Sequence, residues 1–258
     1  MPKFKIILYK YLMSLKNFAL IVLCSASTVT LVACGGGSSS STSPSPLTLN
    51  LNSAWEKHVV GGSSVTGAIS GYCQGTRVWT LTSTYSGTTL DGKPAIISNE
   101  YETDFMAANS NEFCTTYLYN SNDGGKVYQS YYDPKTYVPI SSGSNPPTTV
   151  YLNQVPFPTS VSAGSSGTWH NTVTYENGVP VAAGIQTWSV TADTPTTLML
   201  ITNDKAYTYV GKQLLYNQTN YYRLNADNTL TNLRKNIQPT ALLTGNGDQN
   251  IDEVYQQP

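Results

Sequence analysis

The sequence contains few charged residues and few histidines, and both shortages restrict the classes of function that it can have. Charged residues make up 11% of the 258 residues, against about 25% in ordinary soluble proteins. The two histidines, His58 and His170, are the only candidates for a catalytic base of that type, and no Gly-x-Ser-x-Gly motif surrounds a serine. No phosphate-binding loop or dinucleotide fingerprint occurs either. We therefore predict a protein that is not an enzyme, with no catalytic residue assigned.

Metal ligands at short spacing are also missing. Zinc needs three or four His, Cys or acidic ligands, and the sequence does not bring them together. The alternating carboxylates Glu100, Glu102 and Asp104 share one face of a predicted strand, where we expect them to face solvent. Residues 244–255 only superficially resemble a calcium loop, because Thr244 stands where an aspartate is needed and Tyr255 where a glutamate is needed. We predict no metal and no cofactor.

Basic residues form no stripe or patch. Only Arg234 and Lys235 are adjacent among the lysines and arginines that follow the N-terminal segment. Without the four lysines of that segment, 10 basic residues face 15 acidic ones. Phosphate backbones and anionic lipid surfaces need clustered positive charge, so a nucleic-acid partner is excluded.

The N-terminus is typical of an export signal. Residues 1–18 contain four lysines and no acid, and residues 19–33 are mostly apolar but interrupted by serine and threonine. The motif Leu31-Val32-Ala33-Cys34 resembles the lipobox of bacterial lipoproteins. That resemblance implies removal of residues 1–33 and a lipid anchor on the Cys34 thiol. Ordinary cleavage after Ala26, or an uncleaved anchor, are the alternatives.

A Gly/Ser/Pro-rich tether occupies residues 34–50. Such a linker spans on the order of 20 Å. In lipoproteins of Gram-negative bacteria, aspartate after the lipidated cysteine commonly retains the protein in the inner membrane. Gly35 stands there instead, so the resemblance implies an outer-membrane protein of the cell envelope, facing either the periplasm or the exterior.

Two further cysteines, Cys73 and Cys114, remain in the exported part. In an oxidising compartment two such cysteines usually pair, and no Cys-x-x-Cys spacing points to a redox pair. We predict a structural disulfide between them.

Residues 51–258 have the pattern of an all-β domain. Short runs rich in Thr, Tyr, Val and Ile alternate with Gly, Asn, Asp and Pro clusters, and helical periodicity is almost absent. Short turns between strands favour a mainly antiparallel meander, which we expect to form one strongly curved sheet or half-barrel. Two similar halves, 51–140 and 150–240, followed by a polar C-terminal tail, are an alternative. The predicted strands are 76–84, 95–105, 113–120, 126–132, 167–175, 185–192, 196–202, 206–210, 214–224 and 229–237.

The exported part also resembles a group of uncharacterised exported β-rich lipoproteins of Gram-negative bacteria. The resemblance rests on the segment 71–76 (GYCQGT), the downstream Cys114, and Val155-Pro156-Phe157-Pro158 leading into Gly167-Thr168. It implies a β-rich lipoprotein and brings no activity with it.

Three functions stay open at this point. The leading hypothesis is a non-enzymatic, membrane-anchored envelope lipoprotein with a structural, assembly or protein-interaction role. The alternative is a carrier or binding protein for a lipid or other small ligand, in which exposed Tyr and Trp would contact the ligand. An envelope hydrolase with paired carboxylates is the third, since a sequence does not show how carboxylates are arranged in space.

Overall fold

The computed structural model describes residues 46–84, 89–90, 92–106, 113–114, 126–142 and 148–256, which belong to the unit Pro44–Pro258. The predicted signal peptide and Cys34 lie outside the described residues. So does the segment 122–125, where the sequence predicts a tight turn.

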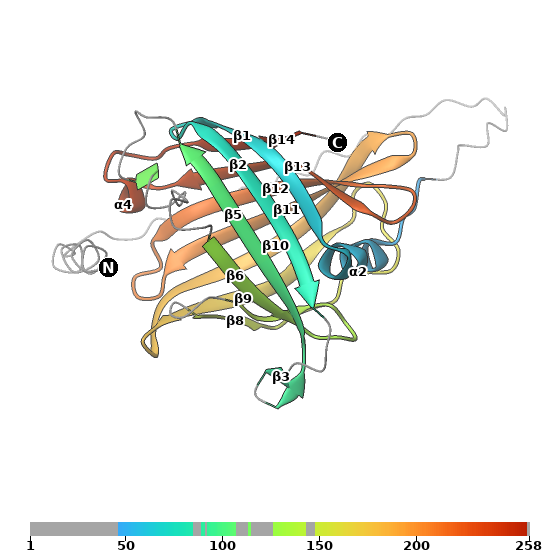
Figure 1. Ribbon diagram of the computed structural model, residues 1–258, viewed down its shortest axis with the longest axis horizontal. Coiled ribbons are helices and arrows are strands. Elements are labelled where there is room, and N and C mark those ends of the chain that lie inside the picture. The colour runs from blue at the N-terminus through green and yellow to red at the C-terminus, as the bar shows by residue number, and fades with distance from the viewer. Residues whose placement is uncertain are drawn as a thin grey trace, which may run out of the picture. The chain divides into compact units, whose positions relative to one another are not determined.

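Twelve antiparallel strands form a closed barrel (Figure 1). The order around the barrel is β1-β14-β13-β12-β11-β10-β9-β8-β7-β6-β5-β2, and β2 pairs again with β1. A two-stranded hairpin of β3 and β4 stands apart from it. The strands are β1 (Ser63–Gly71), β2 (Gly75–Thr84), β3 (Thr89–Leu90), β4 (Lys93–Pro94), β5 (Ile96–Met106), β6 (Lys126–Tyr132), β7 (Pro139–Ser142), β8 (Thr148–Leu152), β9 (Ser166–Glu176), β10 (Val179–Thr194), β11 (Thr197–Thr208), β12 (Leu214–Leu224), β13 (Leu230–Pro239) and β14 (Ile251–Tyr255).

The all-β antiparallel prediction is confirmed, but the barrel is more closed than the predicted half-barrel. Closure depends on two strands that the sequence analysis did not identify, β1 and β14. They pair from Gly67↔Tyr255 to Gly71↔Ile251. The predicted polar tail therefore contains the strand that joins the two edges of the sheet, and no edge of the barrel is left open.

Several predicted boundaries also change. The predicted strands 196–202 and 206–210 form one strand, β11, because Thr202–Ala206 pairs continuously with both neighbours. Phe113 and Cys114 are helical, not the start of a strand; the rest of that predicted strand lies outside the described residues. The Asn/Asp-rich segment 225–228, where the sequence predicts a turn, does form one and joins β12 to β13, with the Asn225 amide donating to the Thr229 carbonyl.

Helix α2 (Leu51–Gly61) packs against one end of the barrel (Figure 1). Its first turn is capped by Asn50, whose side chain accepts a hydrogen bond from the Ser53 amide at 2.9 Å. The apolar face of α2 buries Trp55 against Trp169 and Phe157, with ring centroids 4.7 and 5.5 Å apart. This apolar core continues through the ends of β10, β11 and β12.

A second, smaller apolar cluster lies at the opposite end of these strands. There β1 and β14 bring Ile69 and Ile251 beside the Cys73–Cys114 disulfide, so the predicted bridge is confirmed. The short helix α4 (Ala241–Thr244) follows β13 at this end. No helix in the described part of the chain has the length and apolar run needed to cross a membrane.

Candidate ligand-binding interior

The wall between these two apolar ends is polar on its inner face. Residues paired directly across antiparallel strands share a face, and the registers place the same set inside around the whole barrel: Leu81 opposite Glu100, Thr202 opposite Asn220, and Lys235 opposite Glu253. The larger polar and aromatic members of this inner face are Arg77, Trp79, Glu100, Tyr132, Tyr151, Asp204, Tyr216, Gln218, Asn220, Tyr222, Lys235, Glu253 and Tyr255.

The predicted orientation of β5 is wrong: the face that carries Glu100 is turned toward the barrel interior and not toward solvent. Ser98 is buried and Glu100 faces inward, whereas Tyr101 is 40% exposed on the outer wall. Ile96, which shares the inward face with Ser98 and Glu100, is buried in the apolar core at the end of the barrel. The side chains of Glu102 and Asp104 are outside the described set.

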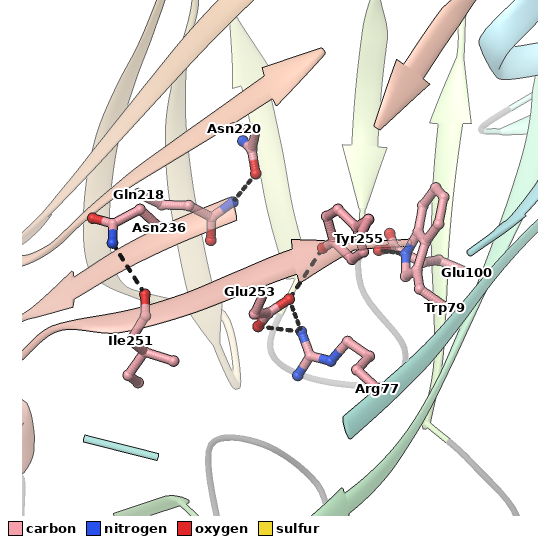
Figure 2. A network of polar contacts seen from close by, with 9 residues as sticks. All are labelled: Arg77, Trp79, Glu100, Gln218, Asn220, Asn236, Ile251, Glu253 and Tyr255. Atoms are coloured by element: carbon pink, nitrogen blue, oxygen red, sulfur yellow. Dashed lines mark hydrogen bonds and ion pairs between the residues drawn. The ribbon is translucent and has the colours of Figure 1, made fainter. Parts of the chain in front are cut away.

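A buried ion pair links β2 to β14. Arg77 Nη1 donates to both carboxylate oxygens of Glu253 at 3.0 and 3.3 Å, and the two side chains are 2% and 0% exposed. The Tyr255 hydroxyl donates to the same carboxylate at 3.0 Å (Figure 2). Burial is the main reason why the pKa of Tyr255 lies well above its usual value. This Arg77–Glu253–Tyr255 network ties together the strands that close the barrel.

A second group surrounds Glu100. The Trp79 indole N–H donates to Glu100 (Figure 2), and the His58 ring from α2 stacks on Trp79 with centroids 6.2 Å apart. The same histidine meets the Tyr222 ring at 5.9 Å. Burial lowers the pKa of His58 to about 4, so this imidazole is neutral at physiological pH.

The negative charge of Glu100 raises the pKa of three tyrosines inside the barrel. Desolvation and that charge raise the pKa of Tyr151 to about 12, and both raise the pKa of Tyr132 and Tyr222 further. These tyrosines lie on β6, β8 and β12, so side chains from strands that are not neighbours in the barrel lie near one carboxylate. Their hydroxyls stay protonated and can donate hydrogen bonds.

Asp204 on β11 is the second inward carboxylate in this region. It accepts a hydrogen bond from the Tyr216 hydroxyl at 3.2 Å, and its register partners are the uncharged Gln186 and Gln218. Desolvation raises the pKa of Asp204 to about 6. Its charge also contributes to the raised pKa of Tyr151, which therefore lies within electrostatic reach of both Asp204 and Glu100.

Two buried polar atoms near this wall have no hydrogen-bond partner among the described residues. They are Trp169 Nε1 and His170 Nδ1, on side chains 4% and 3% exposed. A β-bulge opposite Gln186 and Thr187 turns both consecutive side chains of β9 inward. The His170 ring packs edge-on against Tyr151 at 4.7 Å, and burial lowers the pKa of His170 to about 4.

Because His170 follows Trp169 on a predicted strand, the sequence favours a hydrogen-bonded or exposed histidine there; the structure instead buries the ring and leaves its Nδ1 without a hydrogen-bond partner. The residues that matter here, Asp204, Tyr151 and the Arg77–Glu253 pair, were not identified as a site from the sequence. Only the strand registers show that they share the interior. Among the described residues, no group of three His, Cys, Asp or Glu side chains could hold a metal ion.

Among the described residues, exposed apolar side chains gather on the outer surface at the barrel end away from α2. The β9–β10 and β11–β12 turns lie side by side, because the Tyr209 amide donates to the Val181 carbonyl at 3.0 Å. Val179 and Val210 at their tips are 61% and 76% exposed, and Tyr209 and Leu214 are also exposed. We call these four side chains the hairpin patch.

Comparison with known protein families, with curated proteins and with solved structures finds no match for this chain.

Proposed function

We propose that this chain is a lipid-anchored envelope protein that binds a small ligand on the inner face of its barrel and performs no chemistry on it. The observation that carries the proposal is the composition of that inner face. Protein interiors normally hold few charged side chains, yet five ionisable Arg, Lys, Asp and Glu side chains among the described residues face inward here, and one of them, Asp204, has only uncharged register partners. Polar groups that converge between aromatic rings are typical of a ligand site.

The size of the barrel supports the same proposal. Eight strands enclose an interior that side chains fill or that holds one small ligand, and the diameter grows with strand number. Twelve strands surround this interior. The unsatisfied His170 and Trp169 nitrogens add to the argument, since a buried polar atom without a partner costs about 1–3 kcal/mol and a bound ligand would satisfy it.

The proposal also includes the location of the protein in the cell. We propose that Cys34 is lipidated and holds the domain at the outer membrane through its tether. The Cys73–Cys114 disulfide supports an oxidising compartment. Replacing Cys34 with serine should abolish labelling by a radioactive or clickable fatty acid. Unchanged labelling of Cys34→Ser would contradict the lipid anchor.

Native mass spectrometry of the detergent-extracted protein tests the binding function. We expect a retained small molecule in the wild type and less of it in Asn220→Leu, which replaces an inward amide bonded to Thr202. Asn217→Leu is the matched control, because Asn217 lies on the same strand but faces outward, where it bonds Asn203. Equal ligand loss in the two variants, or a wild type that never carries a small molecule, would contradict an inner-face site.

The hairpin patch supports a second candidate, the protein-interaction role. Exposed apolar side chains gathered in one place commonly mark contact with another protein. Crosslinking in intact cells should yield a specific adduct that Val210→Asp abolishes. Val254→Asp, which adds the same charge at a 48% exposed position on the barrel wall, should leave the adduct intact.

A further inference from the structure

The charges on the inner face are arranged unevenly. Among the side chains that the structure describes, the inward cations are Arg77 and Lys235, and both lie beside Glu253: Arg77 pairs with it and Lys235 is its register partner. Away from that pair, Glu100 and Asp204 are the inward carboxylates of the described wall. These two described carboxylates therefore add negative charge to the inner face away from the Arg77–Glu253 pair.

Asp204 is short of a positive partner. Its hydrogen bond comes from the neutral Tyr216 hydroxyl. Across the neighbouring strands it faces Gln186 and Gln218, and Lys205 beside it in sequence points to the outer wall. Gly184 packs closely beside it: a Cβ there would lie 3.6 Å from Asp204 Oδ1 and would clash with Thr172 Oγ1 at 2.4 Å.

Aromatic rings surround the same region. Tyr151 lies within electrostatic reach of both carboxylates and packs against His170. Trp79 is bound to Glu100, and Tyr222 follows on the other side of His58 (Figure 2 shows the Trp79–Glu100 contact). Ring faces attract cations through their quadrupole, most strongly where water is excluded.

We infer that the ligand is an organic cation carrying a primary ammonium group, held between Asp204, Glu100 and the ring of Tyr151. An ammonium has three N–H donors and no acceptor. One can bond the Asp204 carboxylate, and a second can bond His170 Nδ1 in the tautomer that leaves this atom as an acceptor. The buried, unpartnered nitrogen is thus an observation independent of the carboxylates. This inference rests on the proposed binding function and names the chemical class of the ligand.

Titration of the full lipoprotein in detergent with n-butylammonium chloride, followed by tryptophan fluorescence, tests the inference. 1-Pentanol, of similar size but neutral, and butyrate, an anion, serve as comparison probes at matched ionic strength. We expect butylammonium to bind at least tenfold more tightly than either. Asp204→Asn should weaken butylammonium binding at least tenfold, and Glu100→Gln should weaken it several-fold.

Asp252→Asn is the matched control, because it makes the same change on the outer wall, where Asp252 pairs with Arg234. It should shift the affinity less than twofold. Equal binding of the neutral and cationic probes, or an Asp204→Asn variant that binds butylammonium as well as the wild type, would overturn the inference. A neutral or anionic molecule retained in native mass spectrometry would overturn it too, while leaving the binding function intact. If no probe binds and no molecule is retained, both the ammonium inference and the proposed binding function are contradicted.

Discussion

Arg77 and Glu253 come from strands at opposite ends of the chain, and their buried ion pair lies where the barrel closes. Breaking a buried pair on one side leaves an uncompensated charge, which typically costs 3–5 kcal/mol. We therefore expect Arg77→Met to lower the free energy of unfolding by about that amount in urea titrations. Arg77→Met combined with Glu253→Leu should recover much of the loss. A double variant as unstable as the single one would show that the pair is not the cause.

The surface pair Arg234–Asp252 provides the contrast. Its side chains are 48% and 20% exposed, and exposed pairs contribute about 0–1 kcal/mol. Arg234→Met should therefore change the urea midpoint little. A loss as large as that of Arg77→Met would mean that arginine removal itself, rather than burial of the partner, sets the effect.

Removing the disulfide should destabilise the domain. The cysteines are 41 residues apart, and the chain-entropy description assigns about 4 kcal/mol to closing a loop of this length. We expect Cys73→Ser with Cys114→Ser to lose stability by that order in equilibrium unfolding. The same loss should follow mild reduction of the wild type, whereas a reduced protein that unfolds at the wild-type midpoint would contradict this role.

The two neutral histidines should make the fold acid-sensitive. The pKa of both His58 and His170 is about 4 in the folded protein, below the ordinary 6.5 of the unfolded chain. Stability is therefore fully present above pH 6.5 and falls as the pH drops toward 4, by about 2 kcal/mol per histidine at pH 5. His170→Gln should flatten this fall in unfolding experiments between pH 7 and 5. An unchanged slope would show that His170 takes up its proton without unfolding.

The ionisation of Asp204 should affect the pH dependence of stability in the opposite direction. Its folded pKa, about 6, lies above that of an ordinary aspartate, so the ionised form destabilises the fold as pH rises from about 4 through 6. Asp204→Asn should raise the free energy of unfolding by about 2–3 kcal/mol at pH 7 and by little at pH 4. Because the same variant should bind butylammonium more weakly, stability and binding would trade against each other at one residue. A destabilised Asp204→Asn at pH 7 would contradict this account.

The sequence predicted the strand content, the disulfide and the β12–β13 turn because each has a local signal. Closure of the barrel has no such signal: β14 is five residues long and lies in a polar segment, and its pairing with β1 joins distant positions, from Gly67↔Tyr255 to Gly71↔Ile251. The inner face was missed for a related reason. Alternation in β5 shows that Glu100 and Tyr101 face opposite ways, but only the complete ring of registers shows which side is enclosed.

The central claim is that the interior of the barrel is the binding site. A crystal structure of the protein purified from its native membranes tests it most directly. We predict density for a small organic molecule within hydrogen-bond distance of Asp204 or His170. Density for such a molecule only at the hairpin patch, with the inner face occupied by water alone, would contradict the claim.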